Sequence, residues 1–550
     1  MDGGSRGARR HTDSEKHRPF RWSRTMLVVH NWLGLKLFLI LAVVFVSGTL
    51  AVFRWEIDWL IYPEMRVEPG ETLASLDDIL AAVKRAYPEM GLGAEVPTGV
   101  GAGNLAIGLL GVSPDRGIRM IWVDPYRAVV QGDTPLMTPG FFLASLHRDL
   151  FIPDWGLLIV CATAIVLVVS LVTGLIAYRR FWRGFFRRPR FRTLRLAMVD
   201  LHKLVGLWSL WFIIVIALTG LWYFWVLVGE PMFGFPQAVA RYAPPEIAAD
   251  RVEAFGPETP RTVPIAEALA RAQALHPDFA AGYVSLPEHH GGAYVFHGNR
   301  GEALARYATT ISVDPYTGDV LGVDLARDAP ALARIGAMVN PLHYGDFAGM
   351  WSKTIWFLFG LAVSGLAVTG IVIFWCRTAS ATAGLLPATL RAFHPWRGAM
   401  SWLKPLNWAV LALSIAAAGM TAQFYASRLA DAPARYAPQA VGPWRIGATL
   451  IAGIGDSSDP RVPGRSAIAV VEYCADCWKD IRRLWVAVGA TAPSGDEPGQ
   501  RVKGQPGFAF GGVVLPEALD SQLRLWLIAE GWDRRRHLTS WPLGGGATAQ

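Results

Sequence analysis

The sequence predicts an α-helical membrane protein with about five transmembrane helices, two α+β inserts between them and a small β-rich C-terminal domain. Of its 550 residues, 52% are hydrophobic and 23 are tryptophans, a composition more typical of membrane proteins than of soluble ones. Several apolar stretches are long enough to cross a bilayer. Histidines at the ends of four of these stretches recur with matched spacing, which indicates an internal duplication.

The apolar stretches lie at about Leu27–Phe53, Gly156–Tyr178, Leu204–Val228 and Ile355–Trp375. A fifth, Trp408–Tyr425, is shorter and rich in alanine. Tryptophans cluster near the ends of these stretches, as they do in the aromatic belts of membrane proteins. The first stretch is too long for the core of a signal peptide and lacks a small-residue cleavage site, so we expect it to remain as a span.

Positive charge flanks two of these ends. The first 24 residues carry seven Lys and Arg residues, and the segment 179–195 carries eight arginines. The positive-inside rule places both in the cytoplasm. Nucleic-acid binding by the arginine loop is an alternative, but membrane orientation alone accounts for the charge, so no nucleic-acid partner is expected.

This topology predicts the following organisation. A basic cytoplasmic N-terminus (1–25) precedes spans at 26–54, 147–178, 202–228, 343–376 and 406–426, with outer inserts at 55–146 and 229–342, cytoplasmic loops at 179–201 and 377–405, and an outer β-rich domain at 427–550. We call 55–146 the first insert and 229–342 the second insert. Both halves begin in the cytoplasm, so the duplication is a parallel repeat.

The two inserts share a short motif. Ile121–Tyr126 and Ile311–Tyr316 both end in Val-Asp-Pro-Tyr, which reads as a strand followed by a turn because proline ends the pairing. Helical patterns precede them at Leu76–Ala86 and Ile265–Leu275. We therefore expect a small α+β module in each half. The aspartates of the motif could bind a ligand, but a turn is the favoured role.

The C-terminal region alternates short β-rich runs with Gly/Pro turns and contains Cys474-Ala-Asp-Cys477. In an outer compartment these two cysteines are expected to form a disulfide or to bind a metal, and a redox-active exchange role stays open. Trp478 follows the second cysteine, so the c-type haem attachment motif is absent. Cys161 and Cys376 lie in or beside spans and are expected to be packing residues.

The matched histidines carry the main functional hypothesis. At identical offsets, His30 is followed by Gly34 and Gly48, and His202 by Gly206 and Gly220. At a second pair of identical offsets, His147 is followed by Trp155 and Gly174, and His343 by Trp351 and Gly370. The first two histidines begin spans at the cytoplasmic face, and the other two precede spans at the outer face.

One histidine pair at each level predicts bis-imidazole ligation of two b-type haems, because helices that face one another in a bundle supply imidazoles from opposite sides. The alternative is that all four are ordinary interfacial histidines.

The remaining motifs exclude several other cofactors. Neither histidine level contains soft ligands for copper or an iron–sulfur centre, and bis-histidine iron has no open position, which favours electron transfer. The sequence has no G-x-G-x-x-G after a strand and no Walker A motif, so electrons must come from a partner reductase or a membrane quinol. His289, His290 and His297 could contact a metal-loaded substrate, but a solvated hairpin is the favoured interpretation.

These residues resemble a known family. His30-Asn-Trp-Leu-Gly34, Ser47-Gly-Thr-Leu50, Leu201-His-Lys-Leu-Val-Gly206, Thr219-Gly220 and the Val-Asp-Pro-Tyr strands are similar to those of the PepSY-associated transmembrane proteins over about 26–378. These bacterial inner-membrane proteins include ferric-siderophore reductases. The resemblance implies PepSY-like periplasmic modules and, for the reductases, two haems held by His30, His147, His202 and His343. The tail with Cys474 and Cys477 departs from the family.

The sequence therefore predicts a multi-pass inner-membrane protein, N-terminus in the cytoplasm, that acts as a di-haem b-type reductase. It would pass electrons across the membrane to a periplasmic ferric-siderophore or other ferric complex and release iron, because oxygen-donor chelators hold Fe(II) more weakly. The alternative is a PepSY scaffold that binds or regulates periplasmic proteins without redox activity. The electron donor, the ferric substrate and the oligomeric state are left open.

Overall fold

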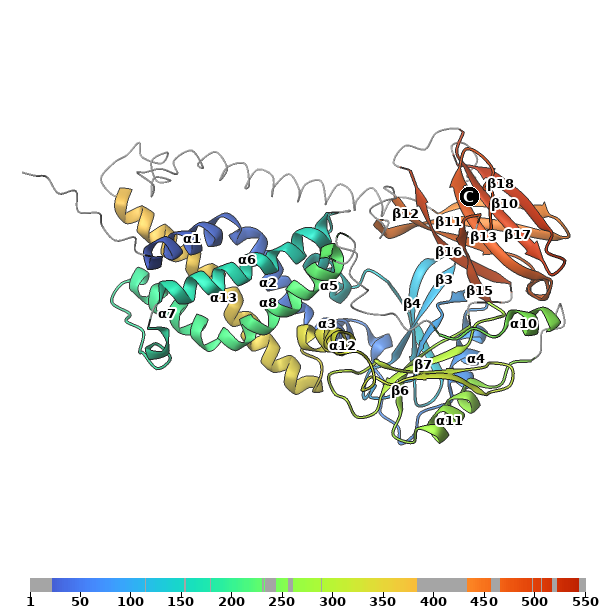
Figure 1. Ribbon diagram of the computed structural model, residues 1–550, viewed down its shortest axis with the longest axis horizontal. Coiled ribbons are helices and arrows are strands. Elements are labelled where there is room, and N and C mark those ends of the chain that lie inside the picture. The colour runs from blue at the N-terminus through green and yellow to red at the C-terminus, as the bar shows by residue number, and fades with distance from the viewer. Residues whose placement is uncertain are drawn as a thin grey trace, which may run out of the picture.

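The chain folds into a helical bundle at one end and a set of β-sheets at the other (Figure 1). The structure is a computed structural model. It describes residues 22–113, 115–152, 155–178, 180–229, 232, 244–255, 261–287, 289–382, 433–456, 465–496, 498–505, 507–516 and 522–543.

Three described helical segments are long and apolar enough to cross a membrane. They are α6 (Gly156–Ala177), α13 (Gly349–Thr382), and α8 (Leu210–Phe224) together with the π-helical turn Trp225–Gly229. A fourth span forms if α1 (Trp22–Lys36) and α2 (Phe38–Ala51), which are bent by 67° at their junction, are counted as one. The predicted fifth span, Trp408–Tyr425, lies outside the described residues.

Shorter helices lead into these spans and carry three of the four matched histidines. They are α5 (Pro139–Asp149), α7 (Leu194–Trp208) and α12 (Ala331–Tyr344). The prediction that His202 begins the third span is wrong in detail. His202 lies inside α7, and the chain leaves helical geometry at Ser209 before α8 begins.

Each insert contributes the predicted helix, α4 (Leu76–Ala86) and α11 (Ile265–Leu275). Ser75 caps α4 by accepting a hydrogen bond from the Asp78 N–H. One antiparallel sheet has the order β1 (Gly91–Leu92), β3 (Ile107–Ser113), β4 (Gly117–Asp124), β5 (Val129–Pro135). The other has the order β2 (Glu95–Pro97), β6 (Ala280–Ser285), β7 (Tyr294–Asn299), β8 (Thr309–Val313), β9 (Val320–Asp324).

The two inserts do not fold as separate modules. Strand β2 belongs to the first insert by sequence, but it pairs with β6 of the second, with Glu95 opposite Ser285. Side chains from both sheets and from α4 and α11 form one hydrophobic core. Asp124 and Asp314 take the predicted turn role, because each carboxylate accepts backbone N–H groups from the two residues after the proline.

The C-terminal domain is a β-sandwich. One sheet has the order β10 (Ala434–Val441), β11 (Trp444–Asp456), β12 (Arg465–Glu472), β16 (Phe508–Leu515), β15 (Lys503–Gln505). The other has the order β14 (Gln500–Arg501), β13 (Ile481–Gly489), β17 (Arg524–Gly531), β18 (Arg536–Pro542). Val112 of the first insert is fully buried with Ile451 and Val470 of this domain, so the sandwich docks on the insert sheet through apolar contacts.

The sandwich also docks on the second insert, through His290. This side chain is only 5% exposed, and its ring lies 4.8 Å from that of Trp478 and 5.3 Å from that of Trp532. Arg482 and Arg534 of the sandwich both pair with Glu253 of α10 (Ala249–Phe255) nearby. The favoured interpretation of a solvated hairpin is therefore wrong for His290, because aromatic side chains remote in sequence cover it.

Because His290 is buried, we expect low pH to weaken the docking of the sandwich on the second insert. Desolvation lowers the pKa of His290 below its ordinary value of 6.5, so the unfolded chain binds a proton more readily than the folded one. The stabilisation is then complete above about pH 6.5 and is lost as the pH falls below it, by at most about 1.4 kcal/mol per pH unit. We expect the Tm of the full-length protein to fall between about pH 7 and pH 5, and His290→Gln to flatten that fall. Parallel pH profiles for wild type and variant would contradict the prediction, and His276→Gln is the control.

Candidate functional site

The four matched histidines form two pairs, one at each end of the bundle. The ring centroids of His30 and His202 lie 6.3 Å apart, and those of His147 and His343 lie 5.9 Å apart. Figure 1 shows α1 and α7, which carry the first pair, at the end remote from the sheets, whereas α5 and α12 lie at the end next to them. Both pairs thus join histidines that are far apart in sequence.

In each ring, Nδ1 is hydrogen-bonded to a neighbouring helix. His30 Nδ1 lies 2.9 Å from the Ser170 carbonyl oxygen, and His147 Nδ1 lies 2.8 Å from the Val44 carbonyl oxygen. Because a carbonyl oxygen can only accept, Nδ1 must carry the proton in both rings. Their Nε2 atoms are then unprotonated in the neutral tautomer.

The other two histidines reach the same tautomer through a hydroxyl. His202 Nδ1 lies 2.9 Å from Thr369 Oγ1, and His343 Nδ1 lies 2.9 Å from Thr219 Oγ1. Each of these threonine hydroxyls donates its own proton to helix carbonyls three and four residues earlier. The hydroxyl oxygen therefore accepts from Nδ1–H, which again leaves Nε2 unprotonated.

The hydroxyl groups occupy matched positions in sequence. Four Ser or Thr residues each precede one of the matched glycines and bond to carbonyls of their own helix, namely Ser47, Thr173, Thr219 and Thr369. The sequence interpretation missed them as functional residues. The recurrence of Ser/Thr-Gly at all four positions was the available signal.

The matched glycines leave space for the imidazoles. A Cβ atom on Gly48 would lie 2.6 Å from the His147 ring, and one on Gly174 would lie 3.3 Å from the His30 ring. A side chain at Gly48 would therefore force His147 to move. Gly34, one turn after His30, has no atom within 4 Å of its Cβ position, so a flat group beside His30 could approach the helix backbone there.

Two polar contacts hold the helices that carry the His147/His343 pair. Asp58 is 2% exposed and accepts hydrogen bonds from the Gly140 N–H and the Thr138 hydroxyl at the start of α5. Trp356 of α13 donates its indole N–H to the Leu342 carbonyl, one residue before His343. These contacts position α5 and α12 relative to the spans, and the sequence interpretation did not find them.

The geometry fits a metal ion between two imidazoles. Imidazole nitrogen binds first-row metal ions at about 2 Å, which puts the centres of two trans rings about 6 Å apart, close to both observed separations. Among the described residues, no group of three or more His, Cys, Asp or Glu side chains could hold a metal ion. Two imidazoles at these separations suit a metal whose other ligands come from a cofactor, as haem iron does. Hydrogen bonds of this kind from Nδ1 orient the histidines that bind metal ions in metalloproteins.

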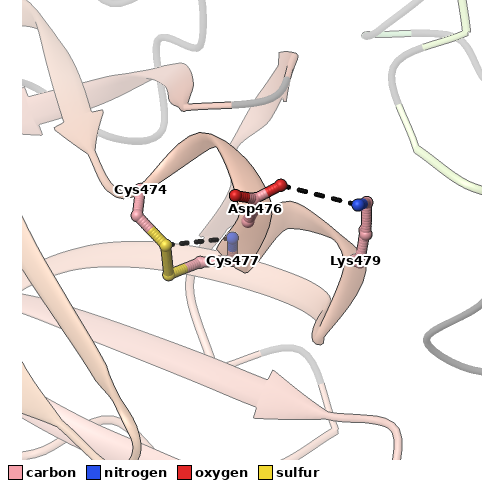
Figure 2. The surroundings of a disulfide bond; sticks show 4 residues. All are labelled: Cys474, Asp476, Cys477 and Lys479. Atoms are coloured by element: carbon pink, nitrogen blue, oxygen red, sulfur yellow. Dashed lines mark hydrogen bonds and ion pairs between the residues drawn. A yellow bond between two sulfur atoms is a disulfide. The ribbon is translucent and has the colours of Figure 1, made fainter.

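The two tail cysteines lie between β12 and β13 of the C-terminal sandwich. Cys474 and Cys477 form a disulfide that encloses the start of a short 3₁₀ turn, Ala475–Lys479. Figure 2 shows this turn, in which the Cys477 N–H donates to Cys474 Sγ and Lys479 pairs with Asp476. Trp478, which contacts His290, directly follows the disulfide, so the bond supports the docking surface of the sandwich.

The fold and the paired histidines define a membrane protein with a helical bundle that could hold a cofactor at each end. Residues 27–377, more than half of the chain, match the family described as PepSY-associated TM region. The chain belongs to this family of PepSY-associated transmembrane proteins, as the sequence motifs predicted. Residues 406–544 match a second family, described as an uncharacterised conserved protein.

One relative is the uncharacterized protein PA4219 of Pseudomonas aeruginosa. It is 27% identical over 261 residues, which is 44% of this chain and 64% of the relative. The chain therefore spans a little under two thirds of that relative's length, and the relative's name carries no activity.

The disulfide gives a stability prediction. A cross-link that closes so short a loop removes about 2 kcal/mol of unfolded-chain entropy, so Cys474→Ser with Cys477→Ser should destabilise the sandwich by about that amount. Mass spectrometry after alkylation without reductant should find both cysteines unmodified, and after reduction both should be labelled. Immediate labelling of Cys474 and Cys477 in metal-free protein would show that the disulfide does not form.

Proposed function

We propose that this protein is a membrane di-haem reductase that transfers electrons across the bilayer to a ferric complex outside the cytoplasm. The observation that supports the proposal best is the common state of the four imidazoles. All four bond through Nδ1 and keep Nε2 unprotonated. Two pairs with ring centres 6.3 and 5.9 Å apart then offer two bis-histidine sites.

When bound, haem at each site would supply reversible one-electron transfer without an open iron position for oxygen chemistry. The residues of the chain hold the ligands in place for this role. Thr219 and Thr369 accept from Nδ1–H and keep two rings in one orientation, whereas helix carbonyls do so for the other two. Gly48 and Gly174 let those rings lie against the neighbouring helices.

The separation of the sites suits transfer across the membrane. Thr369 contacts His202, whereas Trp356 on the same helix bonds to the residue before His343. The stretch of α13 between Trp356 and Thr369 rises about 20 Å, so we expect the two pairs toward opposite faces of the hydrocarbon layer. The arginine-rich segment 180–195 runs into α7, so by the positive-inside rule we expect the His30/His202 pair on the cytoplasmic side.

The proposed electron transfer balances as a one-electron reduction of Fe(III). One electron from a donor on the cytoplasmic side, either a membrane quinol or a cytoplasmic reductase, converts Fe(III) to Fe(II) on the outer side. The chelator is not broken in this step. Oxygen-donor chelators hold the softer Fe(II) ion less tightly, so iron is released. Parallel duplication of the halves, with matched histidines, accounts for the presence of two similar sites in one chain.

Replacing single ligands should remove one haem at a time. We expect two b-type haems per chain by the pyridine haemochrome assay, and one in each of His30→Ala, His202→Ala, His147→Ala and His343→Ala. The first two should lose the same spectral component and the last two the other, because the two histidines of each pair would hold the same haem. His276→Ala, at the end of α11, is the matched control and should retain both.

Two outcomes would contradict this proposal. Well-folded wild-type protein without haem would favour the scaffold alternative, in which the histidines are interfacial. Retention of both haems in all four variants would show that the ligands lie elsewhere.

The orientation can be tested separately. Single cysteines introduced at Arg183 or Arg188 should be labelled from the cytoplasmic side only, and cysteines at Glu95 or Arg300 from the outside only, because the arginine segment is held inside. Labelling in intact cells and in inverted vesicles with a membrane-impermeant maleimide would measure this. Outer labelling at Arg183 would reverse the topology and the direction of electron transfer.

A further inference from the structure

One face of the second-insert sheet carries a row of polar side chains from four neighbouring strands. Tyr283 lies opposite His297 in the strand pairing, His297 opposite Thr310, and Thr310 opposite Asp324. Directly opposed residues in antiparallel strands lie about 5 Å apart, so these four side chains form one continuous row, here called the polar row. The adjoining residues face the shared hydrophobic core instead, namely Val284, Phe296, Ile311 and Val323.

The first insert has the same strand arrangement, so the two faces can be compared residue by residue. When the shared Val-Asp-Pro-Tyr motifs are aligned, Asp314 corresponds to Asp124 and Thr310 corresponds to Met120. Met120 pairs with Thr134 across β4 and β5, just as Thr310 pairs with Asp324 across β8 and β9. Both sheets even carry a register shift at the corresponding place.

In the first insert this face is closed by apolar packing. Met120 and Trp122 pack with Met65 and Val67, which follow α3 (Arg54–Ile61) in the chain. In the second insert, Thr310 replaces Met120 and Ser312 replaces Trp122. The same surface is thus hydrophobic core in one insert and hydrogen-bonding in the other, a difference that the shared fold does not require.

The hydrogen-bonding groups of the polar row are only partly used inside the protein. Thr310 is 5% exposed, and its hydroxyl has no hydrogen-bond partner among the described residues. His297 stacks on Tyr283 with ring centroids 4.4 Å apart, and its Nε2 lies 3.2 Å from Ser285 Oγ. Burial lowers the pKa of His297 to about 4, so at neutral pH the ring is uncharged. Buried hydroxyl groups in folded proteins nearly always have a hydrogen-bond partner, and a bound ligand would supply the partner that Thr310 lacks.

The polar row lies at the end of the sheet that leads to the outer histidine pair. Asp324 ends β9, and the chain then passes to α12, which carries His343. The loop between β7 and β8 is tied to the same region, because Arg306 pairs with Asp346, three residues after His343. Tyr307 of that loop is 51% exposed and contacts Tyr283.

We propose that the polar row binds the ligand shell of a ferric chelate with oxygen donors, and so presents the metal on the outer side next to the His147/His343 pair. The ferric identity of this ligand rests on the proposed function. Neutral hydroxyl and imidazole groups suit carboxylate or hydroxamate oxygens, and the stacked Tyr283 and His297 rings suit a flat organic edge. The described residues here contain no three-ligand metal site, so the row recognises the chelator and does not extract the ion. Reduction adds one electron to Fe(III) and breaks no bond of the chelator.

A redox-inert probe tests binding apart from electron transfer. Full-length protein in detergent is titrated with the gallium(III) complex of a linear trihydroxamate, and the iron(III) complex is used for reduction assays. His297→Gln and Thr310→Val should each weaken gallium-complex binding about three- to tenfold, as expected for one lost hydrogen bond. The KM for the iron complex should rise in proportion, with kcat and the haem spectrum unchanged. Thr310→Ser, which keeps the hydroxyl, should bind as wild type does.

The outcomes separate this inference from the proposed function. Gallium binding that depends on the polar row supports the inference, whether or not iron is reduced. Absence of iron reduction would overturn the reductase but not the binding site. Iron reduction with equal gallium affinity in wild type, His297→Gln and Thr310→Val overturns the inference and leaves the reductase standing. Absence of gallium binding to wild type also overturns it. His276→Gln and Thr317→Val, on α11 and in the β8–β9 turn, are the matched controls.

Discussion

The arrangement of the bundle depends on the need to pair an imidazole N–H inside apolar surroundings. An unpaired polar group costs several kcal/mol in hydrocarbon, and four histidines bring four such groups. Each is paired across a helix interface: α1 with α6, α5 with α2, α7 with α13 and α12 with α8. The spans are otherwise largely apolar, so these bonds favour one rotation and register of the helices, and the same bonds leave Nε2 available.

Local rules explain what the sequence predicted well. The helices of the inserts appear with the predicted bounds, Leu76–Ala86 and Ile265–Leu275, because helical periodicity and a following break are encoded within a few residues. Matched intervals identified the histidines for the same reason. Their Nδ1 partners could be predicted only in part. The hydroxyl partners require Ser or Thr and can be recognised in the sequence, whereas every residue has a backbone carbonyl oxygen.

Contacts between distant segments explain what the sequence did not reveal. The pairing of β2 with β6 joins two inserts that the sequence divides with two spans, and no pattern within Glu95–Pro97 indicates it. His290 is polar and stands in a Gly-rich segment, so local rules predict exposure. Trp478 and Trp532, from the C-terminal domain much later in the chain, bury it instead.

The two inserts differ in the use of the one sheet face that the shared core leaves to each of them. The first insert uses that face for Met65 and Trp122, next to α3, and Asp58 of α3 holds the start of α5, which carries His147. A ligand site there would compete with the packing that positions His147. The second insert is tied to the bundle at its edge, through Arg306 and Asp346. Its face is also covered at Thr310 and Ser312, which are 5% and 0% exposed, but it carries polar groups there in place of Met and Trp. Polar groups on this face do not disturb the packing that joins α3 and α5, which is why the proposed binding surface belongs to the second insert.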